Sequence, residues 1–329
     1  MPARFWMVLA GGRICYNILM KHLIIFHESV PELGGIETAI QNILKLIDRS
    51  QFKVTILYST NIGSHLLFAW SQYADVRRLV RGEFIYGDVC LLASNYVRPA
   101  EIVAKKWIQW IHADYEMYKI PLLRNPEISA YICVSDHVAE VSKRLFGIEP
   151  IVIYNLVDPD FGRETPPVPY LRLITCSRLS QEKGFTRMLT LARLLVDAGV
   201  DFDWDIYGNC PDLNYKRRII RLFEGIPQVC FRGYQQNISR PLSRATYLVQ
   251  LSDHEGCCLS VMEALTLHVP VLVTPFATAK DYISPGVSGY ILPFSMEGID
   301  LDSIVYKIPS KDFNFYPKGD IKQWEQILN

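Results

Sequence analysis

Short apolar runs alternate with amphipathic stretches along most of the chain. The runs are almost continuously apolar, which is typical of strands that are covered on both faces of a parallel sheet. The stretches between them carry apolar residues at helical spacing. Strands are predicted at 22–26, 54–59, 89–93, 107–111, 131–135, 151–158, 171–177, 202–207, 229–232, 247–251, 270–274 and 288–292, and helices at 36–47, 136–146, 185–198, 213–223, 238–245, 259–268, 297–306 and 319–328. This alternation predicts an α/β fold.

The alternation is interrupted once, at 159–169, where proline, glycine and charged residues gather. Such a composition is typical of a linker, so two domains are predicted, at 21–158 and 170–316. A chain of 329 residues is long enough for two domains that each bury a core.

The two ends of the chain lie outside these domains. Residues 317–329 contain an amphipathic helix that Asp320 caps. Residues 1–20 are expected to be a dispensable extension. Arg4 and Arg13 interrupt its apolar patch, and no convincing cleavage site follows, so a signal peptide is not expected.

Composition excludes several classes of protein. The chain has 34 basic and 34 acidic residues, without the basic excess that nucleic-acid binding demands. The eight cysteines form no Cys-x-x-Cys pair, and free thiols in a reducing compartment are expected. No apolar run reaches the length of about 18 residues that a transmembrane helix needs. The local clusters at 77–81 and 105–106 admit two interpretations: a solvated surface, or contact with anionic lipid or an acceptor phosphate.

The most informative stretch is 252–263, between the predicted strand 247–251 and the helix that follows it. Glu255 lies in the loop at the carboxyl end of the strand, where open α/β sheets bind their ligands. The amides of Cys257, Cys258 and Leu259 form an anion site at the helix start. Glu263 follows about one turn later. Carboxylates on both sides of an anion site suit a nucleotide sugar, which has hydroxyls on both sides of a diphosphate.

Glu255-Gly256, with Glu263 eight positions on, matches the Glu-seven residues-Glu motif. Over residues 22–294 the chain resembles the retaining glycosyltransferases of family 4. The resemblance implies the GT-B type of fold, in which two Rossmann-like domains face each other across a cleft. It also implies that Glu263 accepts hydrogen bonds from both ribose hydroxyls, and that Glu255 contacts the hydroxyls of the sugar ring.

The resemblance assigns further residues. Arg178 and Lys183 match the cation pair that stabilises the leaving diphosphate, with Arg178 ending a strand and Lys183 opening a helix. Gly34-Gly35 would let the backbone approach the diphosphate, although a plain tight turn is the alternative. His112 follows a strand directly and would face the sugar across the cleft; the alternative is a structural histidine. Asn155 and Asp158 match a further family motif, in which Leu156 replaces glycine.

The implied activity is a retaining, metal-independent transfer of a sugar from a nucleotide-diphosphate sugar to an acceptor hydroxyl. No cofactor and no metal are expected, and the acceptor would be a saccharide or a lipid-linked oligosaccharide in polysaccharide synthesis. The expected compartment is the cytoplasm, with peripheral contact at the inner face of the membrane as an option. The helix at 317–329 is expected to pack on the N-terminal domain.

Three alternatives stay open. The first is a nucleotide-sugar epimerase of similar fold, and the second is a non-catalytic relative that binds nucleotide. The third concerns Asp203-Trp-Asp205, which spells the Asp-x-Asp pattern of metal-dependent glycosyltransferases. These aspartates begin a predicted strand, at the edge of the sheet away from the ligand side, so a polar strand start is the preferred interpretation.

Overall fold

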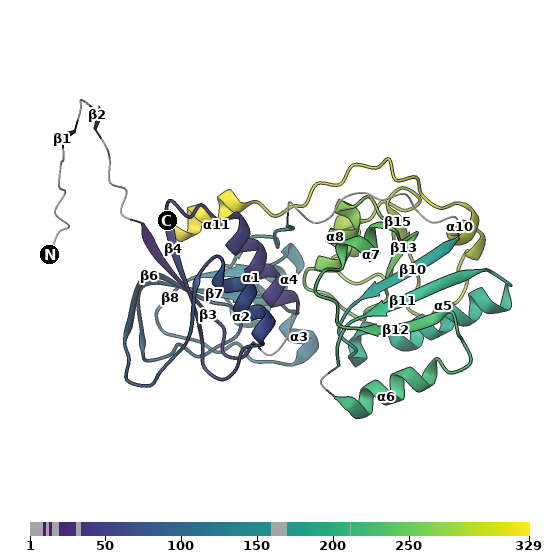
Figure 1. Ribbon diagram of the computed structural model, residues 1–329, viewed down its shortest axis with the longest axis horizontal. Helices are drawn as coiled ribbons and strands as arrows, with labels where there is room; N and C mark the ends of the chain where they lie inside the picture. Colours follow the sequence, from purple (N-terminus) through teal and green to yellow (C-terminus); the bar gives the residue numbers. More distant parts are fainter. Residues whose placement is uncertain (1–8, 11–12, 15–19, 31–33, 159–169, 211) are drawn as a thin grey trace.

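The computed structural model describes residues 9–10, 13–14, 20–30, 34–158, 170–210 and 212–329. They form two α/β domains that lie side by side, which confirms the predicted fold class (Figure 1). The linker predicted at 159–169 and most of the extension 1–20 lie outside these residues. In the extension, the backbone of β1 (Leu9–Ala10) pairs antiparallel with that of β2 (Arg13–Ile14).

The N-terminal domain is built on a seven-stranded parallel sheet with the order β5-β4-β3-β6-β7-β8-β9. Side chains of its central strands are buried on both faces, as the continuous apolar runs predict. Its elements are β3 (Lys21–Phe26), α1 (Gly35–Leu46), β4 (Phe52–Tyr58), α2 (Ser64–Ser71), β5 (Asp75–Arg78), β6 (Ile85–Leu92), β7 (Ile102–Ile111), α3 (Tyr115–Tyr118), β8 (Ile128–Cys133), α4 (Asp136–Phe146) and β9 (Ile151–Val152).

The C-terminal domain has a six-stranded parallel sheet with the order β12-β11-β10-β13-β14-β15. Separate apolar clusters cover its two faces. Its elements are β10 (Leu171–Cys176), the 3-10 turn η1 (Gln181–Lys183), α5 (Phe185–Asp197), β11 (Phe202–Tyr207), α6 (Leu213–Leu222), β12 (Val229–Gly233), α7 (Ser239–Ser243), β13 (Tyr247–Gln250), α8 (Leu259–Thr266), β14 (Val271–Val273), α9 (Ala279–Tyr282), β15 (Gly289–Ile291) and α10 (Leu301–Tyr306).

The last helix, α11 (Ile321–Leu328), returns to the N-terminal domain, as Figure 1 shows in yellow. Trp324 and Leu328 are fully buried in the core of that domain, and the rings of Trp324 and Trp110 meet edge to face at 4.6 Å. The Asp320 side chain accepts a hydrogen bond from the amide of Lys322, which is the predicted cap.

Several predicted boundaries were wrong for local reasons. The helix predicted at 297–306 begins only at Leu301, because Gly298 has a φ of 65° and Asp300 caps the helix. The helix at 259–268 ends at Thr266, and His268 has a left-handed φ of 56°. The strand predicted from 151 has only two residues.

The two basic clusters make local contacts. Arg77 pairs with Asp75, and Lys105 pairs with Asp88. Lys106 donates to the carbonyl of Ile327 in α11. Among the described residues, no helix combines the length and the apolar character needed to cross a bilayer.

Candidate functional site

A cavity of about 610 Å³ lies between the two domains, at the carboxyl ends of both sheets. Its wall contains every residue that the sequence analysis assigns to catalysis or donor binding. The N-terminal domain contributes Gly34, Gly35 and His112. The C-terminal domain contributes Arg178, Lys183, Glu255, Gly256, Cys257, Cys258, Leu259 and Glu263.

Glu255 and Lys183 form an ion pair inside this cavity. The Lys183 ammonium lies 2.7 Å from Glu255 Oε1, and the two side chains are only 14% and 11% exposed. Lys183 ends η1, one residue before Gly184 caps α5, so the prediction that it opens a helix was wrong. Burial has the largest single effect and would lower the pKa of Lys183, but the charge and hydrogen bond of Glu255, together with Cys258 and Tyr118, outweigh it and the pKa is raised.

Glu255 is held by two further donors. Gln250 Nε2 lies 3.0 Å and Ser252 Oγ 2.7 Å from the same Oε1 that Lys183 contacts. Both are polar side chains buried at the end of β13 and in the loop that follows it. The carboxylate is therefore oriented by three contacts and is not an exposed loop group. Sequence reasoning missed Gln250, because its position in an apolar strand suggested a core residue.

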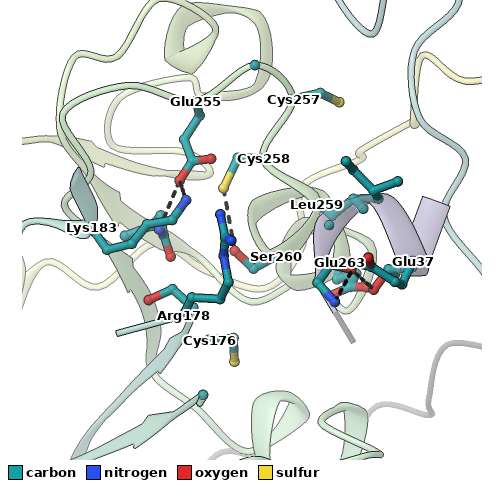
Figure 2. A pocket seen from close by; sticks show the side chains of 18 of the residues that line it. Glu37, Cys176, Arg178, Lys183, Glu255, Cys257, Cys258, Leu259, Ser260 and Glu263 are labelled. Carbon is teal, nitrogen blue, oxygen red and sulfur yellow. Dashed lines mark hydrogen bonds and ion pairs between the residues drawn. The ribbon is translucent and has the colours of Figure 1, made fainter. Parts of the chain in front are cut away.

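Arg178 lies in the loop after β10, two residues beyond the end of the strand. Its side chain is exposed to the cavity (Figure 2). No described residue forms an ion pair or a hydrogen bond with its guanidinium group. Arg178 is therefore a cation without an ion-pair partner among the described residues, whereas Lys183 is paired with Glu255. A planar guanidinium in this position suits bidentate binding of a phosphate.

The N-terminus of α8 forms the floor of the cavity, with Cys258 at the N-cap and Leu259 as the first helical residue. The first amides of a helix have no intrahelical acceptor, and the helix dipole favours an anion there. The thiols nearby are directed to neighbours: Cys257 Sγ lies 3.4 Å from the Tyr282 hydroxyl, and Cys258 Sγ lies 3.4 Å from Ser260 Oγ.

Glu263 lies in the fifth position of α8 and is half-buried against the cavity. No hydrogen-bond donor among the described residues contacts its carboxylate. Burial, with a smaller contribution from the charge of Asp158, raises the pKa of Glu263 to about 8. The carboxyl group is thus largely neutral at pH 7, and a pair of hydroxyl donors would favour its charged form. Asp158 itself pairs with Lys45, while Asn155 lines the cavity.

His112 follows β7 directly and packs on Trp110, with ring centroids 4.1 Å apart. Burial and, to a lesser degree, the nearby His27 lower the pKa of His112 to about 3. The imidazole is therefore neutral at physiological pH, and its Nε2 has no described partner. A neutral ring with one unpartnered nitrogen can exchange a hydrogen bond with a hydroxyl group, but it supplies no fixed charge.

Gly34 is the N-cap of α1, and its amide donates to Glu37 Oε2 at 2.8 Å. Glu37 Oε1 in turn contacts His27 Nε2, also at 2.8 Å. The Gly34 amide is thus already used, whereas a Cβ at Gly35 would meet no atom within 4 Å. Of the two glycines, Gly35 is therefore the one whose backbone a ligand in the cavity could approach. Glu37 was not predicted, although its position three residues after the glycine is a capping signal.

The remaining candidates lie away from the cavity or stay chemically inert there. Asp205 of β11 is buried and pairs with Arg172 and Arg232, which fits the predicted structural role of this strand. Asp203 is exposed. The seven described cysteines are free thiols, and burial raises the pKa of Cys257.

Comparison with known proteins identifies related sequences and solved structures. Residues 160–300 match the family model described as Glycosyl transferases group 1. Over 138 residues the chain is 25% identical to WcaL of Salmonella typhimurium, which is named as a colanic acid biosynthesis glycosyltransferase. This alignment covers 40% of the chain and 34% of that relative, so it spans about a third of the length of WcaL.

Solved structures share the whole architecture. HepE from Anabaena, determined with UDP and glucose, superposes with a TM-score of 0.74 and 14% identity, over 94% of this chain and 98% of HepE. A point mutant of TarM from S. aureus, in complex with UDP, fondaparinux and alpha-GlcNAc-glycerol, gives a TM-score of 0.73 and 11% identity, over 94% and 100% of the two chains. Residues 160–300 thus carry a glycosyl transferases group 1 domain, within the two-domain GT-B fold.

Proposed function

We propose that this protein is a retaining, metal-independent glycosyltransferase that uses a uridine-diphosphate sugar. The observation that carries the proposal is the arrangement of groups that line the cavity: Glu263 and Glu255 lie on opposite sides of Arg178 and the start of α8 (Figure 2). This arrangement suits ribose, diphosphate and sugar in turn. The choice of uridine rests on the UDP in the titles of the similar structures.

Departure of the diphosphate places extra negative charge on its oxygens. Arg178 and the α8 amides are positioned to stabilise that charge without reorganisation, and this supports a reaction that needs no metal. Retention follows if the leaving phosphate oxygen takes the proton of the acceptor hydroxyl on the same face of the sugar. His112 would contact the sugar from the opposite domain, and Glu255 would bind its hydroxyls.

The proposed acceptor is a saccharide or a lipid-linked oligosaccharide of cell-surface polysaccharide synthesis. WcaL carries a name from colanic acid synthesis, and this supports the same class of acceptor here. The site is compatible with a cytoplasmic enzyme that meets a lipid-linked acceptor at the inner face of the membrane.

A screen of nucleotide sugars by thermal shift tests donor binding, since a ligand at 100 times its Kd adds about 2.7 kcal/mol of stability. The donor found should then be incubated with saccharide acceptors, and the product should keep the anomeric configuration of the donor. Turnover should survive excess EDTA. Loss of turnover with EDTA that magnesium or manganese restores would disprove metal independence. Epimerised donor in the absence of any acceptor would favour the epimerase.

A further inference from the structure

Gln250, the last residue of β13, is a polar side chain in an otherwise apolar strand. It is 1% exposed and lies against the cavity between the domains. Its Nε2 donates to Glu255 Oε1 at 3.0 Å and to Ser252 Oγ at 2.7 Å. This fixes the orientation of the amide, because a carboxylate can only accept and the Ser252 proton already goes to Glu255.

The opposite end of the same amide is unsatisfied. Gln250 Oε1 is buried and has no hydrogen-bond partner among the described residues. Burying such a carbonyl destabilises a fold, and an apolar side chain of the same length would avoid that cost. Stability therefore does not explain a glutamine here. Residues that violate local packing rules cluster at functional sites, and this one touches Glu255.

All three contacts of Glu255 converge on one oxygen. Lys183, Gln250 and Ser252 contact Oε1, which leaves Oε2 without a described partner. Figure 2 shows the contact with Lys183. The three donors differ in one respect. Lys183 is a flexible cation that a diphosphate in the cavity would attract, whereas Gln250 at the end of β13 and Ser252 in the loop that follows are neutral and buried.

We propose that Gln250 is a positioning residue, which holds Glu255 in place when Lys183 moves from it to the diphosphate. The inference rests on the proposed function. With Oε1 anchored by neutral donors, Oε2 remains directed at the hydroxyl groups of the bound sugar. Without Gln250, the Glu255 carboxylate would be free to follow the Lys183 ammonium. The site would then bind the sugar more weakly while still binding the nucleotide.

The test compares UDP with a UDP-sugar in the Gln250→Met variant, which keeps the chain length and removes the amide. Calorimetry first identifies which of UDP-glucose, UDP-galactose and UDP-N-acetylglucosamine the unaltered protein binds most tightly relative to UDP. In the variant, the Kd for UDP should stay within about twofold. The ratio of the Kd for UDP to the Kd for the UDP-sugar, which measures the affinity contributed by the sugar, should fall about tenfold. The Tm should not decrease, because the variant no longer buries an unpartnered carbonyl group.

Gln109→Met is the matched control. Gln109 is also a fully buried strand glutamine with an unpartnered Oε1, but its amide contacts Asn95 in the N-terminal domain. Replacement of Gln109 should leave the ratio of the Kd for UDP to the Kd for the UDP-sugar unchanged.

Three results would overturn the inference, and they can be distinguished from one another. The positioning role alone would be refuted if Gln250→Met left the ratio of the Kd for UDP to the Kd for the UDP-sugar unchanged. It would also be refuted if the variant lost UDP and UDP-sugar binding equally and had a lower Tm. Failure of the unaltered protein to bind UDP would overturn the proposed function as well.

Discussion

At the scale of single residues, the two cations that line the cavity differ in their ion pairing, and the sequence does not reveal this difference. Lys183 is paired with a residue 72 positions away, whereas Arg178 faces the cavity without a described partner. Motif spacing predicts that both line the site, but it contains no information on which carboxylate a lysine meets. We therefore assign the first contact with an incoming diphosphate to Arg178.

Arg178→Ala should reduce turnover about 100- to 1,000-fold, or roughly 3–4 kcal/mol, the scale for removing one donor that stabilises transition-state charge. The Tm should hardly change, because the exposed side chain forms no hydrogen bond or ion pair with a described residue. Steady-state kinetics with a saturating donor measures the effect. Arg193→Ala is the control, since Arg193 is an exposed arginine of α5 outside the cavity. Equal turnover in the two variants would disprove the assignment.

Glu263 should make stability depend on pH. Its pKa is about 8 in the folded protein and near 4.5 in the unfolded chain. The folded state therefore holds a proton that the unfolded state releases between these values, so this group lowers the free energy of unfolding as pH rises from about 4.5 to 8. Below that window both states are protonated and the penalty is absent.

Glu263→Gln replaces the neutral acid by an amide of the same shape and removes the penalty. The Tm of the variant minus that of the unaltered protein should therefore increase from pH 5 to pH 8. Differential scanning calorimetry at several pH values without nucleotide measures this difference. A difference that is independent of pH would mean that the carboxyl group ionises normally in the folded state.

At the scale of elements, the apolar pattern predicted the buried strands well, but it missed an edge strand and a helix with a small buried face. The missed strand β5 reads Asp-Val-Arg-Arg, is largely exposed and, among the described strands, pairs with β4 alone. A strand at the edge of a sheet needs no continuous apolar run, so periodicity cannot detect it. The missed helix α2 buries only Leu66 and Trp70 and leaves Phe68 71% exposed, which gives no clear helical stripe.

The helix α11 should contribute to the stability of the N-terminal domain, although it lies at the opposite end of the chain. Trp324→Ala should lower the free energy of unfolding by about 3–5 kcal/mol, because the indole is fully buried against Trp110. Urea unfolding measures the loss. Tyr316→Ala serves as the control: this aromatic of the same terminal segment is 80% exposed, and its loss should change stability by less than about 0.5 kcal/mol. Similar effects in both variants would contradict the docking of α11.

At the scale of the whole molecule, the site is complete only where the two domains meet. His112 and Gly35 belong to one domain, and Arg178, Lys183, Glu255 and Glu263 belong to the other. The domains touch at Gly256, where an added Cβ would lie 2.2 Å from the carbonyl oxygen of His112. Two ring contacts also cross between the domains, Tyr118 with His254 and His65 with Tyr234.

Gly256→Ala should therefore separate catalysis from nucleotide binding. The added methyl group is directed at the backbone of the N-terminal domain, and Gly256 does not have the left-handed φ that would strain an alanine. The domains must then move apart, His112 withdraws from the sugar, and water enters. UDP affinity should stay within about threefold, roughly 0.7 kcal/mol, because the proposed nucleotide site is formed mainly by the C-terminal domain. Sugar transfer should be almost lost.

Small-angle scattering and calorimetry decide this prediction. The radius of gyration of Gly256→Ala with UDP bound should exceed that of the unaltered protein under the same conditions. His112→Ala should likewise keep UDP affinity and lose turnover, but without any increase in the radius. Normal transfer by Gly256→Ala would show that the contact between Gly256 and His112 is not needed for catalysis. Loss of UDP binding in a folded His112→Ala protein would place His112 in the nucleotide pocket. It would refute the prediction that the C-terminal domain binds the nucleotide while His112 of the N-terminal domain contacts the sugar.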